Sequence, residues 1–106
     1  MEDFVVIYTT TCSKEDAKRI SKHLVEEKLA GCVQITGPIQ STYRWDDNIE
    51  IDEEWLCSIK SRKDLIVEVE KAIRKIHPYD VPEIVALPII GGSDDYLTWL
   101  KDQLKS

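Results

Sequence analysis

The sequence has few cysteines and no regular spacing between them. Cys12, Cys32 and Cys57 are an odd number, lie far apart and form no CxxC pair. A disulfide framework requires pairing, and a structural zinc site requires closely spaced ligands. We therefore expect buried or free thiols.

Long apolar runs, repeats and low-complexity tracts are also absent. The first apolar run, 4–8, follows an acidic start and is far too short for a signal peptide or a membrane span. A length of 106 residues suits one domain, 1–106, with a single core. We expect an ordered, cytoplasmic protein with no membrane contact.

Basic residues are outnumbered by acidic ones. The sequence has 14 Lys and Arg against 20 Asp and Glu, a net charge of −6 and an isoelectric point near 4.9. Acids are concentrated in 46–54. Such a charge repels nucleic-acid backbones and anionic lipid and attracts cations. Nucleic acid and membranes are therefore not expected as partners, whereas divalent cations are.

Hydrophobic periodicity in the first half predicts a strand, a helix and a hairpin. The apolar run 4–8 is typical of a central strand buried on both faces. Ser13 predicts the start of a helix that Gly31 stops. Alternation of apolar and polar residues over 33–45 and 49–60 then predicts two paired strands.

The second half predicts another helix and strand, followed by a last helix. Ser61 and Asp64 predict the cap of a helix that ends at Pro78. A fourth strand is predicted over 83–89, with Pro82 and Pro88 marking an edge position or the ends of the strand. A final helix begins at Ser93. The order βαββαβ plus a C-terminal helix predicts an α+β, ferredoxin-like sandwich with a long hairpin between its second and third strands.

The predicted strand 33–45 is too long for its domain. At about 3.3 Å per residue it spans about 43 Å, whereas a domain of this length has a radius of gyration near about 13 Å. The hairpin must overhang the domain or bend at a bulge at 37–38. An overhanging ribbon exposes Tyr43, Trp45 and Trp55, so we expect another chain to cover it. The alternative is a strand that folds back onto its own subunit.

Several motifs occur together in one order along the chain. They are Val33-Gln34-Ile35, PIQSTYRW at 38–45, Ile59-Lys60, HPYDVPEI at 77–84, Leu87-Pro88-Ile89, and Gly92 with YLTW at 96–99. This set resembles the divalent-cation tolerance family called CutA over about 5–100. The resemblance implies a cytoplasmic homotrimer of ferredoxin-like subunits, joined through extended strands, with a role in tolerance to copper and other divalent metals.

The same resemblance leaves a second hypothesis open. The implied architecture also occurs in PII-type signalling proteins, which indicates a regulatory trimer that binds a small ligand or an unidentified protein partner in its intersubunit clefts. Where some family members have a cysteine, this chain has Tyr8, and a phenol does not replace a thiolate as a ligand for soft copper. Contact with Cu²⁺ is therefore expected to be weak or transient.

His77 is the first metal candidate, because imidazole is a common ligand for copper and zinc and the family motif has a histidine here. The alternative is a histidine that interacts with the end of a helix. A lone imidazole holds a metal weakly, so Cys32 or Glu83 is expected to help, across a subunit boundary. For Cys32 the alternative is simple burial.

The stretch 77–84 is rigid, because each of its prolines removes an amide donor and holds the preceding residue extended. Such rigidity suits a connector or a ligand-binding loop. We predict that Tyr79 and Asp80 lie at an intersubunit cleft or interface together with Tyr43, Trp45 and Trp55. The alternative for Tyr79 and Asp80 is hydrogen bonding within the loop.

Catalysis has little support in the sequence. It contains no phosphate-binding glycine loop and no nucleophile elbow. An acylphosphatase-like activity on this fold would need an arginine in the loop after the first strand, and 9–12 reads TTTC. A non-enzyme is expected, and catalysis is the third and least favoured hypothesis.

Overall fold

The computed structural model describes residues 3–106 as a four-stranded antiparallel sheet with helices packed against it. The elements follow in the order β1 (Phe4–Thr11), α1 (Lys14–Glu26), β2 (Cys32–Trp45), β3 (Asn48–Arg62), η1 (Lys63–Leu65), α2 (Ile66–Ile76), β4 (Val85–Pro88) and α3 (Asp94–Gln103). The strand order is β2-β3-β1-β4. The predicted α+β class, with its βαββαβ order and additional C-terminal helix, is confirmed.

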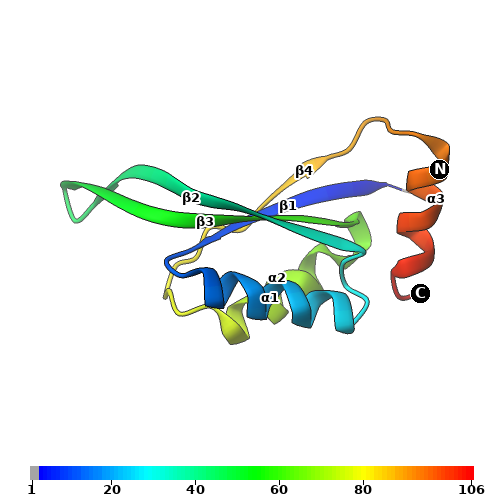
Figure 1. The fold of residues 1–106 in the computed structure, drawn as a ribbon, viewed down its shortest axis with the longest axis horizontal. Helices are drawn as coiled ribbons and strands as arrows, with labels where there is room; N and C mark the ends of the chain where they lie inside the picture. Colours follow the sequence, from blue (N-terminus) through cyan, green and yellow to red (C-terminus); the bar gives the residue numbers. More distant parts are fainter. Residues whose placement is uncertain (1–2) are drawn as a thin grey trace.

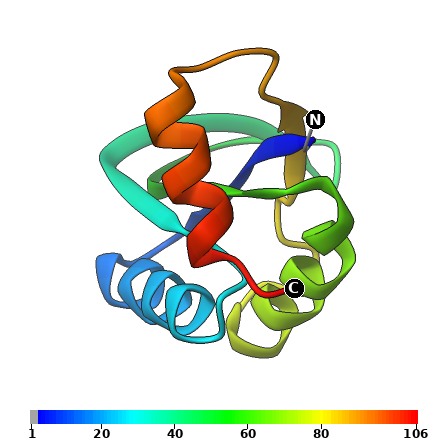
Figure 2. The same ribbon diagram turned by 90° about the vertical axis from the view of Figure 1, so that its right-hand side faces the viewer.

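Helices α1 and α2 cover one face of the sheet, and α3 lies at the end of the sheet remote from the hairpin tip (Figures 1 and 2). The core lies between the helices and the sheet, where Ile7, Ile20, Leu24, Ile59 and Ile73 are fully buried. Strand β1 is central, as predicted. The prediction that this strand is buried on both faces is wrong for the single chain. Val6 and Tyr8 are only half-buried, on the face that no helix covers.

Two predicted helix boundaries need correction. Helix α1 begins after Ser13, whose hydroxyl accepts from the Asp16 amide, as predicted. It ends at Glu26 and not at Gly31. Lys28 takes the left-handed conformation at φ 58°, and the amides of Lys28 and Leu29 donate to the Val25 and Leu24 carbonyls. This pattern is a Schellman motif, in which a lysine occupies the position that glycine usually takes.

Helix α2 does not begin with a Ser61 cap. Ser61 lies within β3, and its hydroxyl donates to the Leu29 carbonyl at 2.6 Å. A short 3₁₀ turn, η1, leads into α2 instead. The cap pattern failed because a buried backbone carbonyl from a distant loop competes for the same hydroxyl. The end of α2 at Ile76, before Pro78, is as predicted.

The β2-β3 hairpin extends beyond the rest of the domain (Figure 1). With the hairpin included, the described chain measures 44 × 25 × 22 Å along its principal axes. Asp46 and Asp47 form its tip with φ values of 48° and 65°, the conformation that a two-residue hairpin loop requires. The predicted irregularity at 37–38 is present as a register shift between Thr36 and Ile39. The bulge bends the ribbon but does not fold it back onto its own subunit.

Candidate functional site

The rigid corner 77–84 begins where α2 ends, and His77 fastens it to the end of β1. The ring is buried, with Nε2 2.6 Å from the Thr10 carbonyl oxygen and Nδ1 3.2 Å from the Tyr79 amide. A carbonyl only accepts and an amide N–H only donates, so Nε2 carries the proton and Nδ1 accepts. The His77 and Tyr79 rings are also in contact, with centroids 4.7 Å apart.

This geometry opposes the predicted role of His77 as the primary metal ligand. Both ring nitrogens already have backbone partners, so a metal at either one would displace a buried hydrogen bond. An unsatisfied buried backbone group costs about 1–3 kcal/mol. The structure therefore supports the alternative, a histidine that holds the end of a helix and its following loop in place.

The corner reaches the hairpin through Tyr79. Its hydroxyl donates to Oε2 of Glu54 at 2.8 Å, and only 7% of Glu54 is exposed. Burial first, and then the hydrogen bond to the Glu54 carboxylate, raise the pKa of the Tyr79 phenol well above its usual value. The phenol therefore stays protonated and remains a donor at neutral pH.

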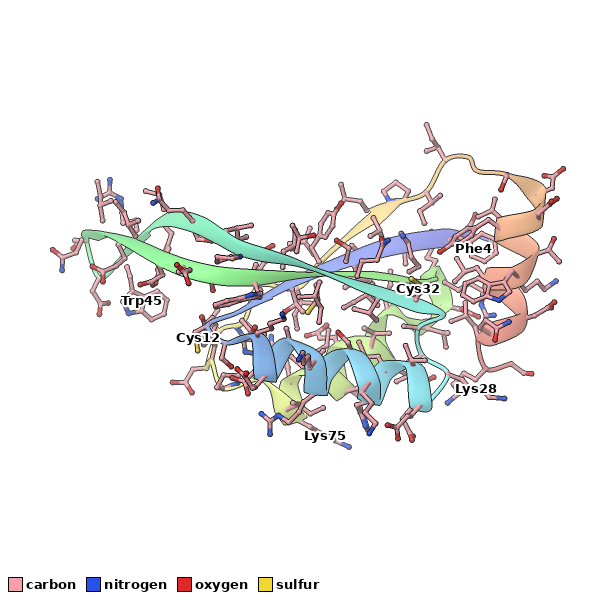
Figure 3. All side chains as sticks on the ribbon, viewed as in Figure 1. Phe4, Cys12, Lys28, Cys32, Trp45 and Lys75 are labelled. Atoms are coloured by element: carbon pink, nitrogen blue, oxygen red, sulfur yellow. The ribbon has the colours of Figure 1, made fainter. Side chains whose placement is uncertain are left out.

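A pocket of about 570 Å³ lies between this corner and the outer part of the hairpin. Its walls are Thr10, Ser41, Thr42, Tyr43, Trp45, Glu50, Glu54, Tyr79, Asp80, Val81 and Glu83. Figure 3 shows Trp45 on the side of the ribbon that faces the β1–α1 turn at Cys12. Within one chain, five of the residues predicted for a site or cleft therefore share a pocket: Tyr43, Trp45, Tyr79, Asp80 and Glu83.

The pocket walls carry negative charge without a basic side chain. Glu50, Glu54, Asp80 and Glu83 contribute carboxylates, and no Lys, Arg or His of residues 3–106 is among the lining residues. Across the hairpin, the hydroxyl of Tyr43 on β2 donates to Asp52 on β3. This hydrogen bond, with smaller effects from burial and nearby acids, raises the pKa of Tyr43 to about 12. The pocket is therefore suited to cations.

The other predicted site residues lie apart from the pocket. Trp55 packs on Gly37 of its own chain, where an added Cβ would come within 2.5 Å of the indole Cδ1. Cys32 lies opposite Lys60 of β3 in the sheet. Thr10, whose carbonyl bonds to His77, lies opposite Leu56 of β3. Those two β3 positions are about 13 Å apart along the strand.

The predicted ligand set of His77, Cys32 and Glu83 does not assemble within one chain. Across residues 3–106, no group of three or more His, Cys, Asp or Glu side chains is arranged to hold a metal ion. All three cysteines are free, as expected: Cys12 is exposed, Cys32 half-buried and Cys57 buried. Burial also raises the pKa of Cys57, which keeps it a neutral thiol.

The sequence did not identify Glu50 and Glu54 as residues of the pocket wall. Both belong to the acidic stretch 46–54. Alternation along a strand does place 50 and 54 on one face. No local signal indicated that Glu54 is buried, because a corner distant in sequence covers it.

The fold and the pocket define a ferredoxin-like protein with a protruding hairpin and an acid-lined pocket between that hairpin and the corner after α2. The family model for the CutA1 divalent ion tolerance protein matches residues 5–103. The chain belongs to this family.

Individual relatives agree with this assignment. The divalent-cation tolerance protein CutA of Thermus thermophilus is 43% identical over 102 residues, which cover 96% of this chain and 97% of that protein. The chloroplastic protein CutA of Arabidopsis thaliana is 42% identical over 96% of this chain. The chain spans 56% of the length of the Arabidopsis protein.

Solved structures have the same fold. The Thermus thermophilus CutA1 structure superimposes with a TM-score of 0.94 at 40% identity and covers 96% of this chain and 99% of its own. The CutA structure from Archaeoglobus fulgidus, which is described as periplasmic, has a TM-score of 0.92 at 38% identity and covers 99% of this chain and 100% of its own. In residues 3–106, no helix is both long and apolar enough to span a membrane.

Proposed function

We propose that this protein acts in divalent-cation tolerance as a non-catalytic homotrimer that binds divalent cations, with Cu²⁺ bound weakly or transiently. One observation carries the proposal: the pocket between hairpin and corner is lined by four carboxylates and by no basic side chain. Carboxylate oxygens suit divalent cations, and the negative field raises their local concentration.

The proposed ligands within the pocket are carboxylates at its rim, led by Glu83 with Asp80. Both are exposed, so they meet hydrated ions without disturbing the fold. Because no three-ligand group is present in residues 3–106, the cation keeps much of its water and binding is weak. In this proposal Cys32, or further ligands, reaches the cation only from a neighbouring subunit.

The homotrimer is proposed from the exposed hairpin and the sheet edges. Trp45, Ile49 and Ile51 are 55%, 66% and 61% exposed, although ribbons of this kind are usually covered. Strands β2 and β4 form the two edges of the sheet. Pairing of these edges between copies would satisfy their backbone groups and shield the apolar residues. The proposal keeps the cytoplasmic location that the family resemblance implies.

A PII-like regulatory trimer remains the second candidate function. Its support is the physical link from the pocket to α2: Tyr79 contacts both Glu54 and His77, and His77 caps α2. A ligand that shifts Glu54 would thereby reach the surface of α2, where a protein partner could bind. An enzyme is not proposed, because the pocket walls hold no nucleophile paired with a histidine base.

Calorimetric titration with Zn²⁺, Cu²⁺ and Mg²⁺ tests the proposal. The wild type is compared with an Asp80→Asn and Glu83→Gln double variant. Asp102→Asn serves as a control, because it removes an exposed charge on α3, at the end of the domain remote from the hairpin (Figure 1). We expect weaker binding in the double variant and unchanged binding in the control. Equal affinity in all three proteins would overturn the pocket as the cation site.

A further inference from the structure

The pocket combines its carboxylates with aromatic side chains, which a site for a simple metal ion does not need. Tyr43, Trp45 and Tyr79 all line it. We propose that the pocket binds an aliphatic polyamine, whose ammonium groups meet the carboxylates while its methylene chain lies along the aromatic rings. This inference rests on the pocket of the proposed function but does not require that the protein bind metals.

The aromatic residues favour an organic cation over a hydrated metal ion. A divalent cation keeps its water and gains little from a tyrosine or tryptophan ring. An alkylammonium group gains both cation–π attraction to the rings and burial of its apolar carbons. In residues 3–106 no cluster of metal ligands competes with this chemistry.

Glu54 is a second and independent observation. Only 7% of this residue is exposed, and within residues 3–106 its one hydrogen-bond donor is the Tyr79 hydroxyl. None of the ion pairs formed within residues 3–106 includes Glu54. A buried carboxylate without a cationic partner is costly. A ligand ammonium group would supply that partner.

The Tyr79 hydrogen bond goes to one carboxylate oxygen of Glu54, Oε2. Within residues 3–106, Thr9 Oγ1 is the only buried side-chain polar atom without a hydrogen-bond partner. The other Glu54 oxygen is therefore not sealed inside the protein, and Glu54 lines the pocket.

The spacing of the acids favours a ligand with more than one positive charge. Glu50 and Glu54 lie on the same face of β3, about 13 Å apart along the strand. Tyr43 pairs with Glu50 across the hairpin, so an aromatic ring stands beside the outer acid. Asp80 and Glu83 line the opposite wall. A ligand with an ammonium group at each end of a methylene chain matches this arrangement better than a single compact cation.

The size of the pocket agrees with such a ligand. Its volume of about 570 Å³ lies within the range of small-molecule sites, about 300–1,000 Å³. Four carboxylates exclude nucleotides and other anions by repulsion. The class of ligand that fits charge, shape and aromatic lining together is the aliphatic polyamine.

Calorimetric titration with spermidine tests the inference on protein freed of metal with a chelating resin. Glu54→Gln keeps the shape of the side chain and an acceptor for Tyr79, and we expect it to weaken spermidine binding roughly tenfold or more, as for loss of a charged hydrogen bond. Trp45→Ala, compared with the wild type at a concentration where light scattering gives both the same oligomeric state, should weaken it several-fold. Asp102→Asn changes the net charge by the same amount as Glu54→Gln and should leave spermidine binding unchanged.

A second pair of variants guards against misfolding of Glu54→Gln. Asp80→Asn and Glu83→Gln alter exposed rim residues and should also weaken spermidine binding. No binding of spermidine to the wild type, or equal weakening in Asp102→Asn, would overturn the inference. Titration with Zn²⁺ separates the two proposals: metal binding without spermidine binding would refute the polyamine site alone, and the reverse result would refute the metal proposal alone.

Discussion

The Tyr79 hydroxyl donates a hydrogen bond of 2.8 Å to the buried carboxylate of Glu54, and it thereby joins the corner after α2 to the middle of β3. The two residues are 25 positions apart in the sequence. Through this contact the acid-lined pocket, the corner and the end of α2 form one connected structure.

Removal of the Tyr79 hydroxyl should destabilise the protein. Tyr79→Phe keeps the ring against His77 but leaves a buried carboxylate oxygen without its donor, at an expected cost of about 1–3 kcal/mol. Urea denaturation measures the change. Tyr8→Phe is the matched control, because no hydrogen bond to the Tyr8 hydroxyl is formed within residues 3–106, and it should change stability by less than about 0.5 kcal/mol. Equal effects of the two substitutions would contradict the role of the bond.

His77→Ala separates a structural histidine from a metal ligand. The substitution leaves the Thr10 carbonyl and the Tyr79 amide without partners, so we expect a loss of about 2–4 kcal/mol in unfolding free energy. Zinc affinity of the folded protein should stay the same, because neither ring nitrogen is available in the wild type. His23→Ala on α1 serves as the comparison. Lost zinc affinity with unchanged stability would restore His77 as a ligand.

Gly37 should not tolerate a side chain. A Cβ there would lie 2.5 Å from Cδ1 and 2.9 Å from Cγ of Trp55, so the indole ring must move. Gly37→Ala is expected to cost about 1–3 kcal/mol in thermal or urea unfolding. Gly91→Ala is the control, because nothing lies within 4 Å of its added Cβ. A neutral Gly37→Ala would mean that Trp55 does not pack there.

The hydrogen bond from Tyr43 to Asp52 predicts a pH dependence of stability. The pKa of Tyr43 is raised from 10.0 to about 12 in the folded protein, so the contribution of this phenol is complete below pH 10.0. Between pH 10.0 and about 12 the unfolded chain releases this proton and the folded one keeps it, so stability falls as pH rises. Tyr43→Phe should lose less stability over this range than the wild type. Ultraviolet titration of the phenols provides a direct check.

The proposed homotrimer predicts the mass of the protein in solution. Light scattering at micromolar concentration should give three times the chain mass of 12.2 kDa, and a monomer of 12.2 kDa would refute the trimer. Trp45→Ala should weaken association more than it destabilises the isolated subunit, because that side chain is 55% exposed within one chain. A melting temperature that depends on protein concentration would report this effect.

Local features of the sequence were sufficient for much of the fold. Apolar periodicity determined the order of strands and helices, Pro78 ended α2, and Asp46 with Asp47 formed the hairpin tip. Each of these features depends on residues close together in the chain. The overlong strand was also readable, because strand length is proportional to residue number.

The tertiary structure decided which polar groups met. The sequence predicted Ser61 as a helix cap, but in the fold its hydroxyl donates to the Leu29 carbonyl. His77 was open to metal until Thr10 and Tyr79 occupied both ring nitrogens.

Glu54 became a buried pocket acid only because a corner from another part of the chain covers it. Periodicity reports which side of an element is buried. It does not report which donor from a distant segment arrives there, because buried polar groups are paired by geometry that forms only when the chain has folded.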